Sequence, residues 1–565
     1  MRLTLNRLIQ ACVVAVIIVI CLYSPLSGSA RNDVELHRSQ SAHRRGKIKT
    51  AFLHGYRAYK TYAFPHDSLK PLSKTYRDDR SGWGLTAVDA LTGAILLEIP
   101  DVVHETLDHV NSIDFDVVEG GKYAVFGTTI RYLGALLSAY DLLTTTHKRL
   151  VSDLPPAKIQ TLLSQAERLG MRLAPAFSTP YGINHHTLFP NGSFENPHND
   201  HTDITSISGL VLEFTHLSSL TGNSTYGTLA QKSMLNLLNP KPDPVSSYPG
   251  LLPKHVNITT GVFETEDLGG WSHSGGGFYE MLMKNYVYDP TGFSDYRDTW
   301  IHAADSTIKN LASHPLQRPD LTFLADFQGD KLIYRADASG MFAPANFILG
   351  GAVTGEKRFV DFGLRLLKSY VSLYEATTSG LAPDVISWIP ATCTSDDVDT
   401  KPECRVPEEY ATQEESGFVK KHGFWATDSR YLLRPEVLES LYYAYRITGD
   451  RKYQRISFDL ATKIIHACWV ESGFAELKDV NVALNQTLTE GKNDWMSSYM
   501  LSEVLMYAYI VHVEVGELML EDGQIMKMAD DGEQDDQSWH VGRKRMEWVF
   551  STQGHPLRVK ASVKS

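Results

Sequence analysis

Hydrophobic residues recur at helical spacing along most of the chain, from Trp83 to about Val513. In the segment 129–137, Leu133 and Leu137 follow Ile130 at i+3 and i+7, the spacing of one face of an α-helix. A similar pattern covers the ranges 206–220, 278–287, 297–312, 346–353, 358–374, 436–447, 453–468 and 499–513. No comparable run of alternating strand positions occurs, although short hairpins could lie in the loops. The pattern predicts an all-α protein.

A repeated turn connects the predicted helices. Each copy has a Thr-Gly-polar triplet that ends one helix, and an aromatic residue that begins the next helix four residues after the glycine. The three glycine–aromatic pairs are Gly222 with Tyr226, Gly355 with Phe359, and Gly449 with Tyr453. Glycine ends a helix at little cost because it accepts a positive φ. Repeated antiparallel helix pairs indicate a bundle, a solenoid or a closed α/α barrel, and periodicity alone does not choose among them.

Three segments depart from the helical pattern. Residues 31–80 are polar and basic and are expected to form a stalk or an extended lead-in, so the predicted helical domain covers residues 81–560. Residues 384–430 form a long polar insertion, which predicts a loop over one face. Residues 514–538 form an acidic insertion that we expect to be solvated.

The N-terminus has the features of a targeting signal. Arg2 and Arg7 precede an apolar run from Leu8 to Tyr23, and the small residues up to Ala30 permit a cleavage site. The run also approaches the length of a membrane span, so residues 1–30 are either a cleaved signal peptide or a type II signal anchor. In both cases the body enters the secretory pathway. Contact with a membrane is expected only through this N-terminal segment.

Glycosylation sequons and cysteines agree with a secretory location. Sequons begin at Asn191, Asn223, Asn257 and Asn485. Cys393 and Cys404 bracket a polar loop and could form a local disulfide in an oxidising lumen, whereas Cys468 lies in a helical pattern and is expected to be a buried free thiol.

Composition narrows the class of partner. The 565 residues are 43% hydrophobic and 21% charged, which is ordinary globular composition. The net charge of −12 argues against a nucleic-acid partner, because such proteins need clustered Lys and Arg. The 27 Tyr, 22 Phe and 9 Trp would suit a carbohydrate cleft, where rings stack on sugars, and equally a large core. The oligomeric state is not indicated.

Several segments, in order along the chain, resemble glycoside hydrolase family 47, the class I α-1,2-mannosidases, and especially its fungal secreted branch. They are the ranges 82–84 and 88–91, Thr129–Gly134, Leu212–Phe214, Phe278–Glu280, Leu433–Ser440 and Phe550–Leu557. The resemblance implies an (α/α)7 barrel of antiparallel helix hairpins with long loops. It also implies a Ca²⁺ ion at the base of the barrel and hydrolysis of α-1,2-linked mannose of N-glycans with inversion.

The resemblance assigns roles to individual residues. Glu436 matches the family's proposed catalytic base, and Pro435 at the N1 position would begin its helix. Glu439 shares the same helix face. Arg434 and Arg131 are expected to bind substrate, and Thr552 matches the residue that binds calcium through its hydroxyl and carbonyl. The other acidic positions around the ion and the mannose subsite are Asp89, Glu280 and Glu503.

Other acidic positions of the family are not acidic in this chain. The two acids usually considered to deliver the proton correspond to Gly127 and Gly276. Further family acids correspond to Thr92, Ser206, Ser497 and Gln553, and two paired cysteines correspond to Met341 and Tyr370. Loss of that disulfide would cost about 2–5 kcal/mol, which a chain of this size can tolerate. Glu119, Glu266 and Asp203 are possible substitutes if the alignment is locally shifted.

These departures bear on activity. General acid catalysis typically contributes about 10²–10⁴-fold, so the sequence predicts an inverting α-1,2-mannosidase-type enzyme with weak or absent turnover. One alternative is a lectin-like protein that binds mannose glycans without hydrolysis. Another is a relative that acts on a different glycoside or small molecule, with Glu436 as base.

Overall fold

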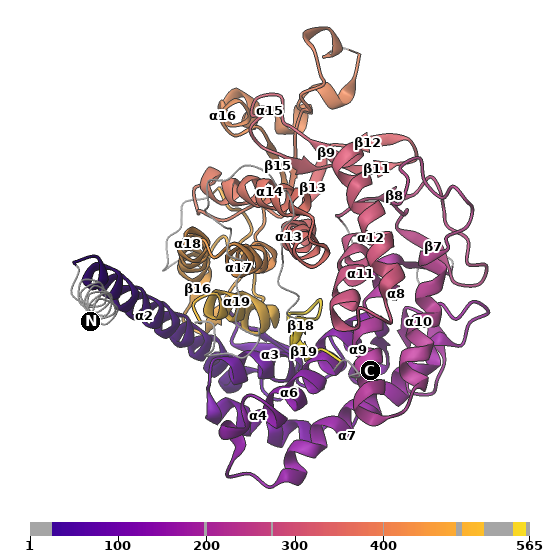
Figure 1. The fold of residues 1–565 in the computed structure, drawn as a ribbon, viewed down its shortest axis with the longest axis vertical. Helices are drawn as coiled ribbons and strands as arrows, with labels where there is room; N and C mark the ends of the chain where they lie inside the picture. The colour runs from indigo at the N-terminus through magenta and orange to yellow at the C-terminus, as the bar shows by residue number, and fades with distance from the viewer. Residues whose placement is uncertain are drawn as a thin grey trace, which may run out of the picture.

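The computed structural model describes residues 25–196, 200–272, 275–398, 400–481, 489–513 and 546–560. Seven of the described helices form an inner ring (Figure 1). Each inner helix packs against the next one in the chain, and the last packs against the first, so the ring is closed. In order they are α3 (Leu85–Leu96), α6 (Gly134–Thr144), α9 (Val211–Thr221), α11 (Gly276–Tyr288), α13 (Ala343–Thr354), α17 (Glu436–Thr448) and α19 (Leu505–Ile510).

A second layer of helices surrounds this ring. Each outer helix packs against an inner helix that is its neighbour in the chain or, for α2, closes the circle by packing against α19. The outer helices are α2 (Pro25–Tyr62), α4 (Pro100–Ser112), α7 (Pro156–Leu173), α10 (Thr225–Leu238), α12 (Ser294–Ser306), α14 (Lys357–Ala376) and α18 (Lys452–Cys468). The (α/α)7 barrel that the sequence led us to expect is therefore confirmed.

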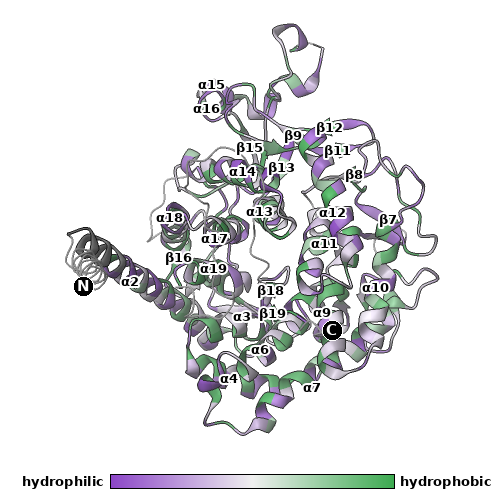
Figure 2. Ribbon diagram, viewed as in Figure 1, coloured by the Kyte–Doolittle hydropathy of each residue, from purple (hydrophilic) through white to green (hydrophobic). Residues whose placement is uncertain are grey.

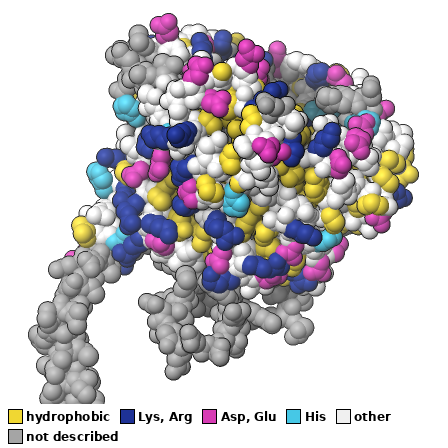
Figure 3. All heavy atoms as spheres, turned by 90° about the horizontal axis from the view of Figure 1, so that it is seen from above, with side chains coloured by type: hydrophobic (Ala, Val, Ile, Leu, Met, Phe, Trp, Pro, Cys, Tyr) yellow, Lys and Arg dark blue, Asp and Glu magenta, His cyan; other side chains and the backbone are white. Residues whose placement is uncertain are grey.

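The helices occupy the two layers because of their hydrophobic patterns. Every residue of α3 is buried, whereas α14 alternates buried and exposed positions along an amphipathic face. Figure 2 shows hydrophobic residues along the helices and hydrophilic residues in the loops at the upper edge. Figure 3 shows Lys, Arg, Asp and Glu side chains spread over one face of the molecule, so both signs of charge are mixed there.

The repeated Thr-Gly turn connects inner helices to outer helices. Gly222, Gly355 and Gly449 are the C-caps of α9, α13 and α17, with φ of 74°, 77° and 69°. The aromatic residue that follows each glycine is buried against the hairpin it begins. A sequence repeat thus marks three equivalent turns of the barrel.

Short strands fill the loops. The two- and three-stranded sheets contain β1 (Ser68–Lys70), β2 (Thr75–Arg77), β3 (Tyr123–Ala124), β4 (Thr187–Leu188), β5 (Phe194–Glu195), β6 (His201–Asp203), β7 (His255–Asn257), β8 (Leu268–Gly269), β9 (Ala312–Ser313), β10 (Phe323–Leu324), β11 (Asp326–Gln328), β12 (Lys331–Ile333), β13 (Arg335–Asp337), β14 (Val385–Ser387), β15 (Trp425–Asp428), β16 (Trp469–Val470) and β17 (Gly473–Phe474). Short helices α5 (Val125–Thr128), α8 (Ile204–Ser208), α15 (Ala411–Glu415) and α16 (Phe418–His422) also lie in the loops, together with short 3-10 and π-helical turns.

A C-terminal hairpin lies inside the ring (Figure 1). Strands β18 (Trp548–Phe550) and β19 (Pro556–Arg558) pair antiparallel, with Val549 opposite Leu557. The hairpin contacts α6 and α11, and the Ser138 hydroxyl donates a hydrogen bond to the Pro556 carbonyl over 2.6 Å. Its turn therefore reaches the axis of the barrel.

The packed body begins earlier than the sequence predicts. Residues 31–80 are expected to be a stalk or lead-in, but Ile48, Phe52, Tyr56 and Tyr59 of α2 are buried in the core, and residues 68–77 form the β1–β2 hairpin. The segment is polar on average, and this average hid the apolar face that α2 turns toward the core. The predicted targeting segment before Pro25 and the acidic insertion 514–538 lie outside the described residues. Among the helices described, none is both long and apolar enough to cross a bilayer.

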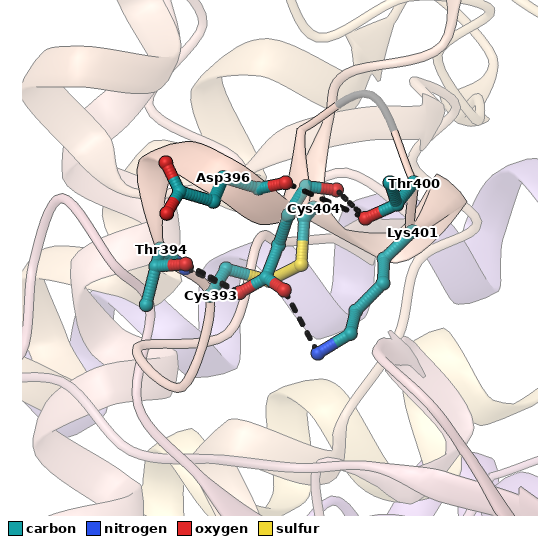
Figure 4. The surroundings of a disulfide bond; sticks show 7 residues. Cys393, Thr394, Asp396, Thr400, Lys401 and Cys404 are labelled. Carbon is teal, nitrogen blue, oxygen red and sulfur yellow. Dashed lines mark hydrogen bonds and ion pairs between the residues drawn. A yellow bond between two sulfur atoms is a disulfide. The ribbon is translucent and has the colours of Figure 1, made fainter.

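The polar insertion forms a lobe with its own small core. Cys393 and Cys404 are joined by a disulfide, a possibility that the sequence leaves open, and they pack with Ile389, Val419 and Trp425. Figure 4 shows the polar contacts around this bond; the Asp397 carboxylate accepts hydrogen bonds from Thr394 and forms an ion pair with Lys401 over 2.9 Å. The remaining cysteine of the described residues, Cys468, is buried and free, which also agrees with the prediction.

Candidate active site

A cavity of about 200 Å³ opens at the axis of the barrel. Its walls come from α11, α17, the π-helical turn Met500–Val504, the turn of the C-terminal hairpin and the segment 126–131. The lining residues are Phe126, Ile130, Arg131, Thr205, Trp271, Gly276, Gly277, Glu280, Ser339, Phe342, Arg434, Pro435, Glu436, Glu439, Tyr499, Glu503, Thr552 and Gln553. The structure thus brings together most of the site residues that the sequence predicts.

Glu436 is the first residue of α17, with Pro435 at the N-cap rather than at N1. Its Oε1 lies 3.7 Å from Nη1 of Arg434, and its Oε2 has no hydrogen-bond partner among the described residues. Burial raises the pKa of Glu436 to about 7, although the charge of Arg434 opposes the shift. This carboxyl is therefore buried, lies close to a cation, and has one oxygen without a hydrogen-bond partner among the described residues.

Arg434 is held by a residue that sequence reasoning missed. The Nε atom of Arg434 donates a hydrogen bond to Oδ1 of Asp384 over 3.3 Å. Asp384, Arg434 and Glu436 also line a water-sized space of about 10 Å³ behind the main cavity. Asp384 lies in the polar insertion, where no helical spacing relates it to Glu436, so only the fold places the two carboxyls on either side of Arg434.

A buried lysine links two of the predicted acids. Lys284 Nζ lies 2.5 Å from Oε1 of Glu280 and 3.2 Å from Oε1 of Glu439. It also donates to the Ser551 carbonyl over 3.3 Å. The i, i+4 spacing of Glu280 and Lys284 was a signal in the sequence that could have found this contact. Burial raises the pKa of Glu439, and Lys284 opposes that rise.

The turn of the C-terminal hairpin supplies two more contacts. The Thr552 hydroxyl donates to Oε2 of Glu280 over 2.6 Å. The Gln553 amide donates to Oε1 of Glu503 over 2.5 Å. Burial and the neighbouring charges of Glu436 and Asp89 raise the pKa of Glu503 well above its ordinary value. Thus Glu280, Glu439 and Glu503 each have a direct partner.

Glu213 of α9 is a further buried carboxyl beneath this turn. Its side chain is fully buried, and neither of its oxygens has a hydrogen-bond partner of ordinary geometry among the described residues. Burial raises the pKa of Glu213 to about 8, and the nearby Glu280 adds to the rise. Sequence analysis included Glu213 in the family-like segment Leu212–Phe214 but assigned no role to it.

Asp89 and Arg131 support the wall of the cavity from behind. Oδ2 of Asp89 accepts hydrogen bonds from Ser498 over 2.5 Å and from Arg131 over 3.4 Å. Oδ1 of Asp89 lies 3.1 Å from Nε2 of His555. Burial opposes ionisation, but the contacts with His555 and Arg131 hold the pKa of Asp89 below its ordinary value. Asp89 is completely buried, so it positions Arg131 and His555 and does not line the cavity.

Gly276 and Gly127 have different surroundings. A Cβ atom at Gly276 would lie 2.5 Å from the Trp271 carbonyl oxygen and 2.8 Å from the Phe342 ring. A Cβ atom at Gly127 would have only Nε of Arg80 within reach, at 4.0 Å. Position 276 is therefore closed to any side chain in this conformation, whereas position 127 is open.

The other non-acidic positions make local hydrogen bonds. The Ser497 hydroxyl donates to Glu476 over 3.3 Å, Thr92 contacts Nδ1 of His555 over 3.1 Å, and the Ser206 hydroxyl donates to Asp203 over 2.7 Å. The Met341 and Tyr370 side chains are buried. These positions thus have polar or apolar neighbours that suit the residues present.

The three possible substitute acids do not line the cavity. Asp203 caps α8 by accepting from the Ser206 amide over 2.8 Å. Glu266 lies against Gly329, and Glu119 lies against Gly82. Among the described residues, the segment 126–131 together with Thr205, Gly276 and Gly277 presents no carboxyl to the cavity.

The fold and the sequence both have counterparts among known proteins. A closed ring of paired helices around a carboxyl-rich axial cavity defines the class of protein, an α/α barrel whose buried carboxyls can act as acids or bases. The structure is similar to that of an alpha-1,2-mannosidase from Trichoderma reesei, with a TM-score of 0.81 and 38% sequence identity. The match covers 92% of this chain and 99% of the Trichoderma reesei chain. The model of glycosyl hydrolase family 47 matches residues 51–559, and the chain belongs to that family.

Curated relatives agree with this assignment. The chain is 38% identical to the probable mannosyl-oligosaccharide alpha-1,2-mannosidase 1B of Aspergillus clavatus over 528 residues, covering 93% of this chain and 95% of the relative. It is also 38% identical to the mannosyl-oligosaccharide alpha-1,2-mannosidase of Coccidioides posadasii over 522 residues, covering 92% and 91%.

Proposed function

We propose that the cavity binds a high-mannose glycan and cleaves α-1,2-linked mannose slowly, with Glu436 as the base that activates water. One observation carries the assignment of Glu436. Among the four cavity carboxyls, Glu280, Glu439 and Glu503 are engaged by Lys284, Thr552 or Gln553, whereas Glu436 keeps an oxygen without a protein partner. That oxygen is the one available to a water or a sugar hydroxyl.

The slow rate follows from the rest of the wall. Inversion requires a second carboxyl about 6.5–9.5 Å from the base, so that water fits between them. Glycine at positions 127 and 276 supplies no proton, and general acid catalysis is typically worth about 10²–10⁴-fold. Glu436 can accept a proton from water only in its ionised form, so its pKa of about 7 favours activity above neutral pH. The hydrogen bond from Arg434 to Asp384 positions the Arg434 guanidinium beside Glu436.

The same proposal includes a Ca²⁺ ion at Thr552. Glu213, Glu280, Glu439 and Glu503 surround the turn that holds Thr552, and Lys284 is the cation in contact with two of them. The oxygens of Glu213 that lack protein partners fit a hydrated cation. Among the described residues, no three acidic, His or Cys side chains converge as direct ligands, so Thr552 would hold the ion together with water. When bound, calcium would supply positive charge to the floor of the cavity.

We further propose that the protein works in the secretory pathway, either secreted or held by its N-terminal segment. The Cys393–Cys404 disulfide supports an oxidising compartment. The sequon residues Asn191 and Asn223 are exposed, as N-glycosylation requires, and Asn257 is half-buried. Asn485 lies outside the described residues.

A second candidate is glycan binding without hydrolysis. The observation that favours it is the packing at Gly276, where Trp271 and Phe342 occupy the space of a side chain. An acid is therefore not merely absent from this position but sterically excluded in the present conformation. The cavity and its arginines would remain able to bind sugar hydroxyls.

The two candidates differ in mannose release. Purified protein is incubated with a high-mannose oligosaccharide and calcium, beside the Trichoderma reesei relative. We expect release about 10²–10⁴-fold slower than by the relative, with loss of the remaining rate in Glu436→Gln. The matched control, Glu415→Gln, changes an exposed glutamate of α15 and should keep the wild-type rate.

The outcomes separate the hypotheses. A rate equal to that of the relative contradicts the loss of the proton donor. Unchanged release by Glu436→Gln contradicts its role as base. Tight binding without release, measured by titration calorimetry with the same glycan, supports the second candidate.

A further inference from the structure

One wall of the cavity mouth is rich in arginine. Arg131 lines the cavity and lies 5.6 Å from the centre of the Tyr499 ring, which also lines it. Arg77 lies 5.4 Å from the centre of the Trp495 ring, and the Trp495 indole donates to Ser497 over 3.1 Å. Arg77 and Arg131 thus contact two rings, Trp495 and Tyr499, that lie four residues apart in the chain.

Arg80 belongs to the same wall. Its Nε faces the open space at Gly127, at 4.0 Å from the position of a Cβ atom there, and Phe126 next to it lines the cavity. Arg80 and Arg77 are both exposed. Both side chains are thus open to water, and Arg80 faces Gly127, which presents no carboxylate.

The positive charges of Arg77 and Arg80 are not paired with a carboxylate among the described residues. Arg80 donates to the Asp79 carbonyl over 3.2 Å, and Arg77 contacts the face of Trp495. Within the described part of the chain, no carboxylate oxygen lies within 4.0 Å of either guanidinium. A guanidinium with free donors at the edge of a pocket is suited to bidentate binding of a phosphate or carboxylate.

The nearby acids are turned to other partners. Asp78 binds His66 over 2.8 Å and the Asp67 amide over 3.0 Å. Asp79 accepts from the Ser68 hydroxyl over 2.8 Å. Asp67 accepts from the amides of residues 80, 82 and 85 and from Tyr132, and Glu119 lies against Gly82. These contacts organise the backbone of the turn and leave the arginine side chains facing outward.

We propose that the preferred ligand is a mannose-containing glycan with an anionic substituent, a phosphate or a carboxylate, bound by Arg77 and Arg80. The inference rests on the proposed function, because the cavity must hold the sugar while the arginine wall holds the charge. On the floor of the cavity, Lys284 and Thr552 contact Glu280, and Gln553 contacts Glu503, whereas Arg77 and Arg80 form no ion pair with either of these carboxyls.

The test measures binding to the full-length protein by titration calorimetry. The probes are mannose, mannose 6-phosphate, mannuronate and inorganic phosphate, each at low and at high NaCl. We expect mannose 6-phosphate or mannuronate to bind about tenfold more tightly than mannose. The gain should shrink at high salt because the arginines are exposed. The mannuronate and mannose 6-phosphate arms show which anion is preferred.

Two variants test whether Arg77 and Arg80 cause the tighter binding of charged sugars. The double variant Arg77→Ala/Arg80→Ala should lose the preference for the charged sugar, with folding verified by its melting temperature. Arg451→Ala, which removes an exposed arginine at the start of α18, should keep it. Equal binding of mannose and both charged sugars overturns the inference. So does inorganic phosphate binding as tightly as mannose 6-phosphate, or retention of the preference by the double variant.

Failure of this inference is distinguishable from failure of the proposed function. Release or binding of the neutral high-mannose glycan does not depend on an anionic group. Binding of that glycan with no gain from charge leaves the proposed function intact and removes only the inference. Absence of binding by every sugar, neutral or charged, overturns both.

Discussion

The effect of adding a side chain differs between Gly127 and Gly276 because their surroundings differ. The space at Gly127 is open toward Arg80, whereas the space at Gly276 is filled by the Trp271 carbonyl and the Phe342 ring. A carboxyl can therefore be added at one position without rearrangement and at the other only by displacing backbone. The two positions are not equivalent routes to higher activity.

Gly127→Glu is expected to increase mannose release by about tenfold or more, because it adds a proton donor to an open wall. Arg80 will hold the pKa of the new carboxyl down, so the gain should be larger when Arg80 is changed to Met. Gly127→Gln is the matched control, with the same size and no acidic proton. An equal gain in the glutamine variant would show that shape, not acidity, limits the rate.

Gly276→Asp is expected to destabilise the fold by about 1–3 kcal/mol, since it overpacks a filled site. Chemical denaturation of this variant beside Gly127→Glu checks the contrast between the two positions. Similar stability of both variants would contradict the packing at Gly276.

Glu213 is expected to make stability depend on pH when calcium is removed. Its folded pKa of about 8 lies above the ordinary value of about 4.3, so the folded state holds the proton more tightly than the unfolded state. The contribution of Glu213 to the free energy of unfolding is therefore fully present below about pH 4.3 and is lost as the pH rises through about 8. Glu213→Gln removes that loss.

Thermal denaturation in a chelator measures this effect. The melting temperature of Glu213→Gln relative to wild type should rise between pH 5 and pH 9. Glu415→Gln, at an exposed position, should follow the wild type throughout. A constant difference between Glu213→Gln and the wild type across this range would show that Glu213 does not titrate as its burial predicts.

At the scale of elements, the Thr-Gly turns determine how each inner helix passes to its outer partner. Gly355 has φ of 77° and no atom within 4 Å of a Cβ position, so any cost of a side chain there comes from the backbone alone. Gly355→Ala should cost about 1–2 kcal/mol, because non-glycine residues disfavour positive φ.

Gly46 in the middle of α2 is the matched control for this turn. It likewise has no atom within 4 Å of a Cβ position, but its backbone is helical. Gly46→Ala should stabilise the protein by about 0.5–1 kcal/mol, since alanine favours the helix. Denaturant unfolding of both variants measures the difference. Equal effects would show that φ does not control the turn.

At the scale of the whole molecule, buried charge connects the barrel to its C-terminal hairpin. Lys284 of α11, Glu439 of α17 and Thr552 of the hairpin turn meet at the axis, so three distant parts of the chain depend on one another. A cation bound there would stabilise the closed ring as a unit.

Calcium is therefore expected to raise the melting temperature of the whole barrel. Binding at about 100 times the dissociation constant contributes about 2.7 kcal/mol. Chelation should lower the melting temperature, and added calcium, but not the same concentration of sodium, should restore it. Thr552→Ala should abolish the response. A melting temperature that does not change on chelation would contradict calcium binding at this turn.

Local sequence patterns predicted the helices and the inner-to-outer turns and allowed a Cys393–Cys404 bond, and contiguous motifs of the family suggested Glu436, Glu439 and Thr552 as site residues. These features follow from short-range rules, namely helical spacing, glycine at positive φ and residues in contiguous motifs. Tertiary structure alone decided that α2 belongs to the body, that Asp384 lies beside Arg434 and that Gly276 is closed while Gly127 is open. It also buried Glu213 completely and left Arg77 and Arg80 exposed. Such facts depend on which distant segments meet when the ring closes, and no local pattern of residues encodes that meeting.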